Sequence, residues 1–161
     1  MAVPAFFPEY QQAVDAELQR RCAVSDDPVE QSMAYTLLSP SKRVRPVLTL
    51  LTAELCRGNR TNSLPVAVAV EMVHASSLIL DDLPSMDDAP LRRGKPSNHL
   101  KFGEAIAILA AFGLLNRAFG TIAESYDGET ANRLVALFSQ AVGPDGLIGA
   151  QAGHLLATDT N

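Results

Sequence analysis

Apolar side chains recur along this chain at spacings of three and four residues, which is the pattern of amphipathic helices. No stretch alternates between apolar and polar residues as a surface strand does, and no internal repeat is evident. Proline and glycine divide the pattern into segments of helical length. The pattern therefore predicts an all-α fold with helices over residues 8–23, 28–38, 46–57, 63–83, 103–124 and 128–142 and from residue 146 onward.

Several residues mark where these helices begin and end. Asp26 or Asp27 is placed to cap the second helix. Pro46 suits the first position of the third helix, and Gly58 follows its expected end. Pro84 would clash with the carbonyl four residues earlier, so the fourth helix must end or kink before it.

Two apolar stretches, residues 64–80 and 105–115, raise the question of a membrane span. The first contains Glu71 and His74, and the second is shorter than the ~20 residues that a span requires. We expect neither to cross a membrane. Residues 103–124 are apolar on almost every face, which predicts a fully buried central helix.

The composition is that of a globular protein, because 47% of the 161 residues are hydrophobic and 19% are charged. Residues 1–161 are therefore expected to form a single all-α domain. A formal net charge of −5 argues against general nucleic-acid binding. No signal-peptide pattern is present, and the isolated cysteines, Cys22 and Cys56, suit a reduced protein without zinc. We expect a cytoplasmic location.

Acidic residues gather where the fourth predicted helix ends. Asp81 and Asp82 close the helix, where its macrodipole disfavours negative charge, and Asp87 and Asp88 follow shortly after. A bound cation would offset this repulsion. Oxygen ligands without a nearby cysteine favour a hard ion, Mg²⁺ or Mn²⁺. Acidic clusters without a metal are also common, so the motif alone leaves both interpretations open.

The break at Pro84 matters for the geometry of this cluster. In a continuous helix Asp87 would lie on the face opposite Asp81, whereas a turn at Pro84 allows it to return toward the same ion. His74 lies seven residues before Asp81, on the same helical face, with Ser77 between them. A histidine on an apolar helix is often only a core residue, but the shared face favours a functional one.

Basic residues form two clusters in this acidic protein. Lys42 and Arg45 are three residues apart next to a predicted helix start, which already attracts anions. Arg92 and Arg93 follow the aspartates, and Gly94 allows close approach of the backbone to a phosphate. Either cluster alone is compatible with solvated surface charge. Together with a metal site they suit two diphosphates, one bound through metal and the other directly by cations.

The motifs occur in the order and spacing of a known family. SKRVRP at residues 41–46 and HASSLILDDLPSMDDAPLRRGKPSNH at residues 74–99 resemble trans-isoprenyl diphosphate synthases of the geranylgeranyl and farnesyl type. The resemblance runs from about residue 30 and covers the N-terminal half of the family's usual length. It implies the isoprenoid synthase helical bundle, a homodimer, and chain elongation in which isopentenyl diphosphate condenses with an allylic diphosphate.

The resemblance also implies roles for individual residues. The residues that would hold the diphosphate of isopentenyl diphosphate are Lys42, Arg45, His74 and Arg93. The residues that would act on the allylic diphosphate are the Mg²⁺ ligands Asp81, Asp82 and Asp87, together with Arg92. Gln151 matches a further substrate-binding position, although His154 stands where the family carries an acid.

Product length in the family depends on the residues just before the aspartates. Here Ser76 and Ser77 are small, which leaves room for a longer tail and predicts geranylgeranyl diphosphate (C20), built from dimethylallyl, geranyl or farnesyl diphosphate. A farnesyl diphosphate synthase and a non-catalytic regulatory subunit are the alternatives. A class I terpene cyclase would not need the isopentenyl anchors Lys42, Arg45 and His74.

The family's second aspartate-rich motif is absent from the 161 residues, and the last predicted helix is still in progress at Asn161. We therefore expect the bundle to be truncated before that motif. One wall of the expected Mg²⁺ site would then be missing. A chain of this kind is expected to bind diphosphate weakly and, alone, to be inactive or impaired in condensation.

Overall fold

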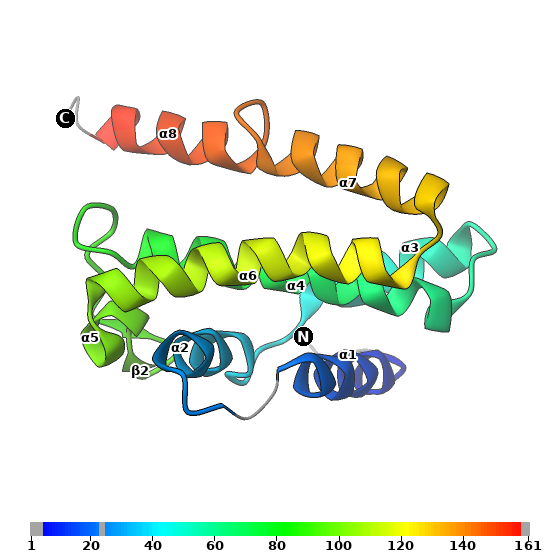
Figure 1. Cartoon of the computed structure of the whole chain (residues 1–161), viewed down its shortest axis with the longest axis horizontal. Coiled ribbons are helices and arrows are strands. Elements are labelled where there is room, and N and C mark those ends of the chain that lie inside the picture. The colour runs from blue at the N-terminus through cyan, green and yellow to red at the C-terminus, as the bar shows by residue number, and fades with distance from the viewer. Residues whose placement is uncertain (1–4, 23–24, 159–161) are drawn as a thin grey trace. The chain divides into compact units, whose positions relative to one another are not determined.

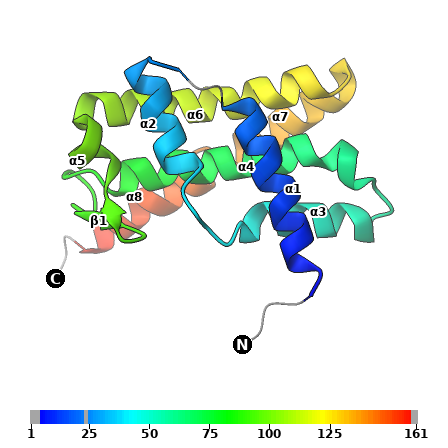
Figure 2. The same cartoon turned by 90° about the horizontal axis from the view of Figure 1, so that it is seen from below.

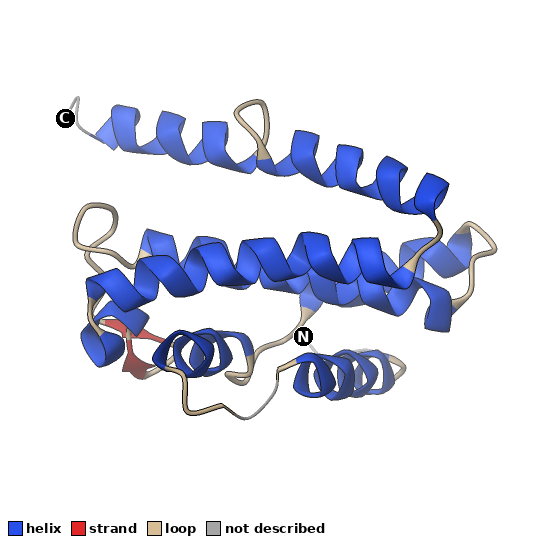
Figure 3. Cartoon of the chain, viewed as in Figure 1, coloured by secondary structure: helices blue, strands red, loops and turns tan. Residues whose placement is uncertain are grey.

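The computed structural model describes residues 5–22 and 25–158. Its described residues are predominantly helical (Figure 3), which confirms the all-α prediction. In chain order the elements are α1 (Phe7–Arg21), α2 (Pro28–Leu37), α3 (Val44–Leu55), α4 (Arg60–Asp81), β1 (Leu91–Arg92), β2 (Lys95–Pro96), α5 (Asn98–Phe102), α6 (Glu104–Ser125), α7 (Gly128–Val142) and α8 (Leu147–Thr158).

The chain divides into two compact units, Met1–Thr121 and Ile122–Asn161. The first unit holds α1 to α5 with most of α6, and the second holds the end of α6 with α7 and α8. All the charged residues singled out above, from Lys42 to Arg93, belong to the first unit. The expectation of one domain stays a prediction.

Helix α4 is the central element of the first unit. It contacts α1, α2 and α3, and α1 and α2 cross it (Figure 2). Helix α6 runs alongside α4 (Figures 1 and 2), and Ser76 Oγ donates to the Ala111 carbonyl at 2.8 Å. Apolar side chains from all these helices are fully buried, among them Leu18, Met33, Leu37, Leu50, Met72, Ile79 and Leu114.

Close packing between α2 and α6 depends on a glycine. A Cβ atom at Gly113 would lie 2.7 Å from Sδ of Met33, which is itself only 2% exposed. Real Cβ atoms do not tolerate that distance, so a side chain at Gly113 would require the Met33 side chain to move from its buried position.

The predicted starts of α2 and α7 are confirmed, and so is the predicted cap of α2. Asp27, rather than Asp26, caps α2, because its Oδ1 accepts from the N–H groups of Val29 and Glu30 at 2.9 and 3.0 Å. Helix α7 begins at Gly128 as predicted, with Asp127 as its cap.

The predicted starts of α3 and α4 were wrong by two and three residues. Helix α3 begins at Val44, which places Pro46 third, within a turn whose N–H groups have no intrahelical partner. Helix α4 begins at Arg60 because the Asn59 side chain caps it, and Pro65 lies inside the helix. Proline so close to the start removes one backbone hydrogen bond and leaves the helix intact.

The prediction of full burial for α6 was also wrong. Ile108, Leu109 and Phe112 are 37%, 52% and 63% exposed, whereas Ala111 and Leu114 are buried. A helix packed along one side leaves its opposite face uncovered, however apolar that face is. An apolar composition therefore does not by itself show that a helix face is buried.

Helices α4 and α6 are each 22 residues long and apolar enough to span a membrane, judged by length and composition alone. The argument that the second apolar stretch is too short is thus wrong, since α6 continues to Ser125. Within the protein, 50% of the most apolar window of α4 and 39% of that of α6 is buried. Core helices have the same properties, and membrane spanning stays untested.

The second unit contains α7 and α8, which contact each other and follow one another end to end across a short connection (Figure 1). The connection is built on glycine: the Gly146 N–H donates to the Gly143 carbonyl at 2.9 Å. A Cβ at Gly146 would lie 2.1 Å from the Ala141 carbonyl oxygen, so only glycine fits there.

Candidate functional site

A cavity of about 400 Å³ opens where the loop before α3 meets α4. Its lining includes a run of residues from Pro40 through Arg45, and it receives two side chains from α4 and one from the β1–β2 turn. These three distant contributors are Glu71, His74 and Arg93. The first turn of α3, whose N-terminus attracts anions, forms part of the wall.

Four cationic or potentially cationic side chains predicted to share a site are therefore brought together by the fold. Lys42 and Arg45 come from the loop and the first turn of α3, His74 from α4, and Arg93 from the hairpin turn. Pockets with this charge bind multivalent anions. The structure thus assembles the predicted isopentenyl diphosphate residues in one cavity, while their role stays a prediction.

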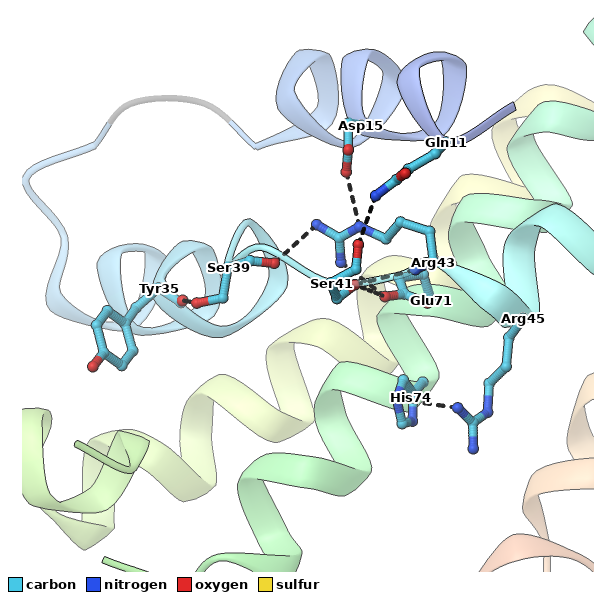
Figure 4. A network of polar contacts seen from close by, with 9 residues as sticks. All are labelled: Gln11, Asp15, Tyr35, Ser39, Ser41, Arg43, Arg45, Glu71 and His74. Atoms are coloured by element: carbon cyan, nitrogen blue, oxygen red, sulfur yellow. Dashed lines mark hydrogen bonds and ion pairs between the residues drawn. The ribbon is translucent and has the colours of Figure 1, made fainter. Parts of the chain in front are cut away.

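His74 is held as a neutral acceptor in this cavity. Arg45 Nη1 lies 3.3 Å from His74 Nε2 (Figure 4), and because a guanidinium only donates, Nε2 accepts and Nδ1 carries the proton. Burial lowers the pKa of His74 below its ordinary value, and Arg45 lowers it further. A neutral His74 keeps a donor available that an anion could use.

Arg93 is placed by a tight turn that the sequence analysis missed. Strands β1 and β2 form an antiparallel hairpin, with Arg93 (φ 55°) and Gly94 (φ 76°) at its tip. Both residues have the positive φ that such two-residue turns require. The dipeptide Arg-Gly was the available signal. Burial lowers the pKa of Arg93, although the guanidinium stays charged at neutral pH.

Arg43, the other arginine of the 42–45 cluster, has a different environment from Arg45. The side chain of Arg43 is only 3% exposed, and it pairs with Asp15 on α1 and Glu71 on α4, both at 2.8 Å. Figure 4 shows it between these helices while Arg45 points toward His74. This difference could not be predicted from the local sequence, because both carboxylates lie 28 residues away along the chain.

The aspartate motif begins where α4 ends, as predicted. After Asp81 the chain turns through Pro84, and the Asp87 N–H donates to the Asp81 carbonyl at 2.9 Å. The turn therefore returns Asp87 to the helix end, as the interpretation of Pro84 required. Asp87 is exposed and Asp81 is half-buried.

The Asp82 side chain is directed toward Arg92 in this structure. Its side chain is 3% exposed and accepts hydrogen bonds from Arg92 Nε, at 3.0 Å to Oδ1 and 3.2 Å to Oδ2, and from Arg92 Nη2 at 2.5 Å to Oδ1. This pairing raises the pKa of the Arg92 guanidinium. Asp82 and Arg92 thus satisfy one another, and their predicted roles toward metal and allylic diphosphate stay untested.

No three acidic, histidine or cysteine side chains within residues 5–22 and 25–158 lie close enough to form a metal site on their own. The carboxylates of Asp81 and Asp87 are suitable oxygen donors at one turn. Mg²⁺ commonly binds through one or two carboxylates with waters and substrate phosphates completing its shell. The donor chemistry of Asp81 and Asp87 suits Mg²⁺, whereas Asp82 is paired with Arg92, and metal binding stays a prediction.

The predicted product-length residues differ in environment. Ser76 is buried and bonded to the α6 backbone, so its side chain faces a neighbouring helix. Ser77 is half-buried, and its hydroxyl donates to the His74 carbonyl at 2.9 Å. Gln151 lies on α8 in the second unit, and its role stays a prediction.

Comparison with known proteins identifies the family of this chain. Residues 26–151 match the family model described as polyprenyl synthetase, so the chain belongs to that family. A farnesyl diphosphate synthase from Geobacillus stearothermophilus is 44% identical over 161 residues, covering 96% of this chain and 54% of the relative. A geranylgeranyl diphosphate synthase from Pantoea ananas is 52% identical over 138 residues, covering 83% and 45%.

The fold agrees as well. The crystal structure of an FPP/GFPP synthase from Zymomonas mobilis superimposes with a TM-score of 0.89 at 33% identity, over 95% of this chain and 57% of that one. The chain therefore has the all-α isoprenoid synthase fold. It spans about half the length of the curated relatives it matches.

Proposed function

We propose that this chain supplies the isopentenyl diphosphate pocket and the first aspartate-rich motif of a chain-elongating prenyltransferase. The observation that carries the proposal is the cavity in which Lys42, Arg45, His74 and Arg93 converge from three separate segments. Helix α4 presents His74 to this cavity and ends at Asp81, so one rigid element would relate the two diphosphate sites.

In the proposed reaction the allylic diphosphate loses its diphosphate group, the isopentenyl double bond attacks the resulting carbocation, and a proton is lost. Lys42, Arg45 and Arg93 would hold the isopentenyl diphosphate by charge-assisted hydrogen bonds, with His74 Nδ1–H as a neutral donor. These residues would bind and orient isopentenyl diphosphate, whereas the aspartate motif would act on the departing diphosphate of the allylic substrate.

Asp81 and Asp87 would hold Mg²⁺ at the end of α4. When bound, the ion would stabilise negative charge on the departing diphosphate. Arg92 would assist only after exchanging its bonds to Asp82 for bonds to phosphate. The pairing in the structure would then be a resting arrangement that keeps the arginine near the motif.

We further propose a C20 product, supported by the small side chains Ser76 and Ser77 before the motif. Relatives named for farnesyl and for geranylgeranyl products are both similar to this chain, so C15 is the second candidate. Because Ser76 is packed against α6, Ser77→Phe is the sharper variant for shortening the product. A C15 product from the unmodified protein would contradict the C20 proposal.

The test is condensation of labelled isopentenyl diphosphate with geranyl diphosphate as the allylic substrate, by the protein expressed from its gene, with product length and intact protein mass recorded. We expect Mg²⁺-dependent incorporation that Asp81→Asn reduces by about 100-fold or more, as for loss of a catalytic metal interaction. If the protein ends at Asn161, we expect impaired turnover. Equal incorporation by wild type and Asp81→Asn would contradict the role given to Asp81.

A further inference from the structure

Arg43 is the one arginine in the 42–45 cluster whose side chain points into the protein. It is 3% exposed, whereas Lys42 and Arg45 on either side are exposed residues of the cavity. Its guanidinium makes three contacts: Nε to Asp15 Oδ1, Nη1 to Glu71 Oε1, and Nη2 to the Ser39 carbonyl at 3.3 Å. Arg43 therefore connects the loop before α3 to α1, to the turn after α2 and to α4.

The backbone of Arg43 is in a conformation that these contacts must maintain. With φ 49° and ψ 37° it lies in the left-handed region, which L side chains other than asparagine and aspartate rarely adopt. It caps α3 without a side-chain bond to the helix. The adjoining loop is held too, since Gln11 Nε2 donates to the Ser41 carbonyl at 2.8 Å (Figure 4). The directions of Lys42 and Arg45 follow from this loop geometry.

Arg43 also compensates the negative charge of Glu71 in the cavity wall. Glu71 lines the anion cavity, is 3% exposed, and precedes His74 by one helical turn on α4. An uncompensated carboxylate there would repel a diphosphate, most strongly because little water is present to screen it. The 2.8 Å ion pair with Arg43 cancels that charge, and Ser41 Oγ contacts the same oxygen at 3.4 Å.

We propose that Arg43 is a positioning residue for the anion cavity: it fixes the loop that aims Lys42 and Arg45 and neutralises Glu71 in the cavity wall. Arg43 also lines the cavity, but Asp15, Glu71 and the Ser39 carbonyl occupy its guanidinium, so it acts through these residues and not by binding the diphosphate. The proposal rests on the proposed function, because it requires that the cavity bind a diphosphate.

The chain offers a matched control in Arg60. This arginine also bridges helices of the first unit, through Glu54 on α3 at 2.8 Å and Glu9 on α1 at 2.6 Å, but it does not line the cavity. Arg43→Gln and Arg60→Gln each remove an interhelical arginine. Only the first should change the anion cavity.

The test is calorimetric titration of the metal-free chain with inorganic diphosphate, alongside thermal unfolding of each variant. We expect Arg43→Gln to weaken diphosphate binding by about tenfold or more, which corresponds to about 1.4 kcal/mol. Arg60→Gln should lower the melting temperature and leave the dissociation constant within about twofold of wild type. A folded Arg43→Gln protein that binds like Arg60→Gln would overturn the proposal.

If Arg43→Gln does not fold, Glu71→Gln decides the matter, because it removes the opposing charge and keeps Arg43. We expect it to bind diphosphate about threefold or more tightly than wild type. Unchanged or weaker binding would overturn the charge-cancelling role. A wild-type chain that shows no diphosphate binding, with Lys42→Gln identical to it, would instead contradict the proposed function.

Discussion

At the end of α4, Asp82 and Arg92 form an ion pair whose members differ in exposure. The Asp82 side chain is 3% exposed and that of Arg92 is 35% exposed. A buried charge that loses its partner cannot be solvated, whereas a half-exposed one can turn toward water. The two residues should therefore contribute unequally when each is removed.

We predict that Arg92→Leu lowers the free energy of unfolding by about 2 kcal/mol, because it strands the Asp82 carboxylate. Asp82→Asn should lower it by about 1 kcal/mol or less, since the remaining arginine reaches solvent. Urea denaturation of both variants measures the difference. A larger loss from Asp82→Asn than from Arg92→Leu would contradict the burial argument.

His74 predicts a pH dependence of stability. Burial, and then Arg45, lower its pKa in the folded protein, whereas unfolded histidine titrates near its ordinary value of 6.5. Between these pKa values the unfolded chain binds more protons, so stability falls as pH decreases through 6.5. The charged groups that act on His74 from around it are Arg45, Glu71, Arg93 and Arg92.

The measurement is the free energy of unfolding of wild type and His74→Gln from pH 7.5 to 5.5. The advantage of wild type should be largest above pH 6.5 and should shrink below it. A difference between the two proteins that is constant over this range would rule out titration of His74 as its cause.

At the scale of elements, the α2 cap gives a local prediction with its control beside it. Asp27→Ala should cost about 1 kcal/mol of stability, because two N–H groups at the start of α2 lose their acceptor. Asp26→Ala should change stability by less than about 0.5 kcal/mol, since its side chain is exposed and does not cap the helix. Equal losses, measured by thermal unfolding, would contradict the assignment of the cap.

Helices were predictable here because apolar spacing and caps act over one or two turns. The helix starts were less predictable. Pro46 was expected as the first residue of its helix, yet α3 begins at Val44, and the helix expected from residue 63 begins at Arg60, which leaves Pro65 further inside it. The β1–β2 hairpin escaped prediction because two-residue strands have no periodicity. The turn at Pro84, by contrast, was predictable from a single steric clash, and it returns Asp87 to Asp81 as expected.

At the scale of the molecule, the candidate site was predictable where its residues belong to contiguous motifs. Lys42, Arg45, His74 and Arg93 were chosen from such motifs, and the fold brings them to one cavity. The burial of Arg43 was not predictable, because its partners Asp15 and Glu71 come from other helices. The exposed face of α6 was missed for the same reason, since composition does not say which neighbours a helix has.

The central claim is that the cavity at the start of α3 binds a diphosphate through the Lys42–Arg45 motif. Calorimetric titration of the metal-free chain with inorganic diphosphate tests it most directly, comparing wild type, the Lys42→Gln/Arg45→Gln double variant, and Lys101→Gln. Lys101 is a suitable control because it stacks 4.1 Å from the Tyr35 ring centre and does not line the cavity.

We predict measurable binding by wild type and Lys101→Gln, and binding weakened about tenfold or more in the double variant. Equal affinity in all three proteins, or none in wild type, would contradict the account.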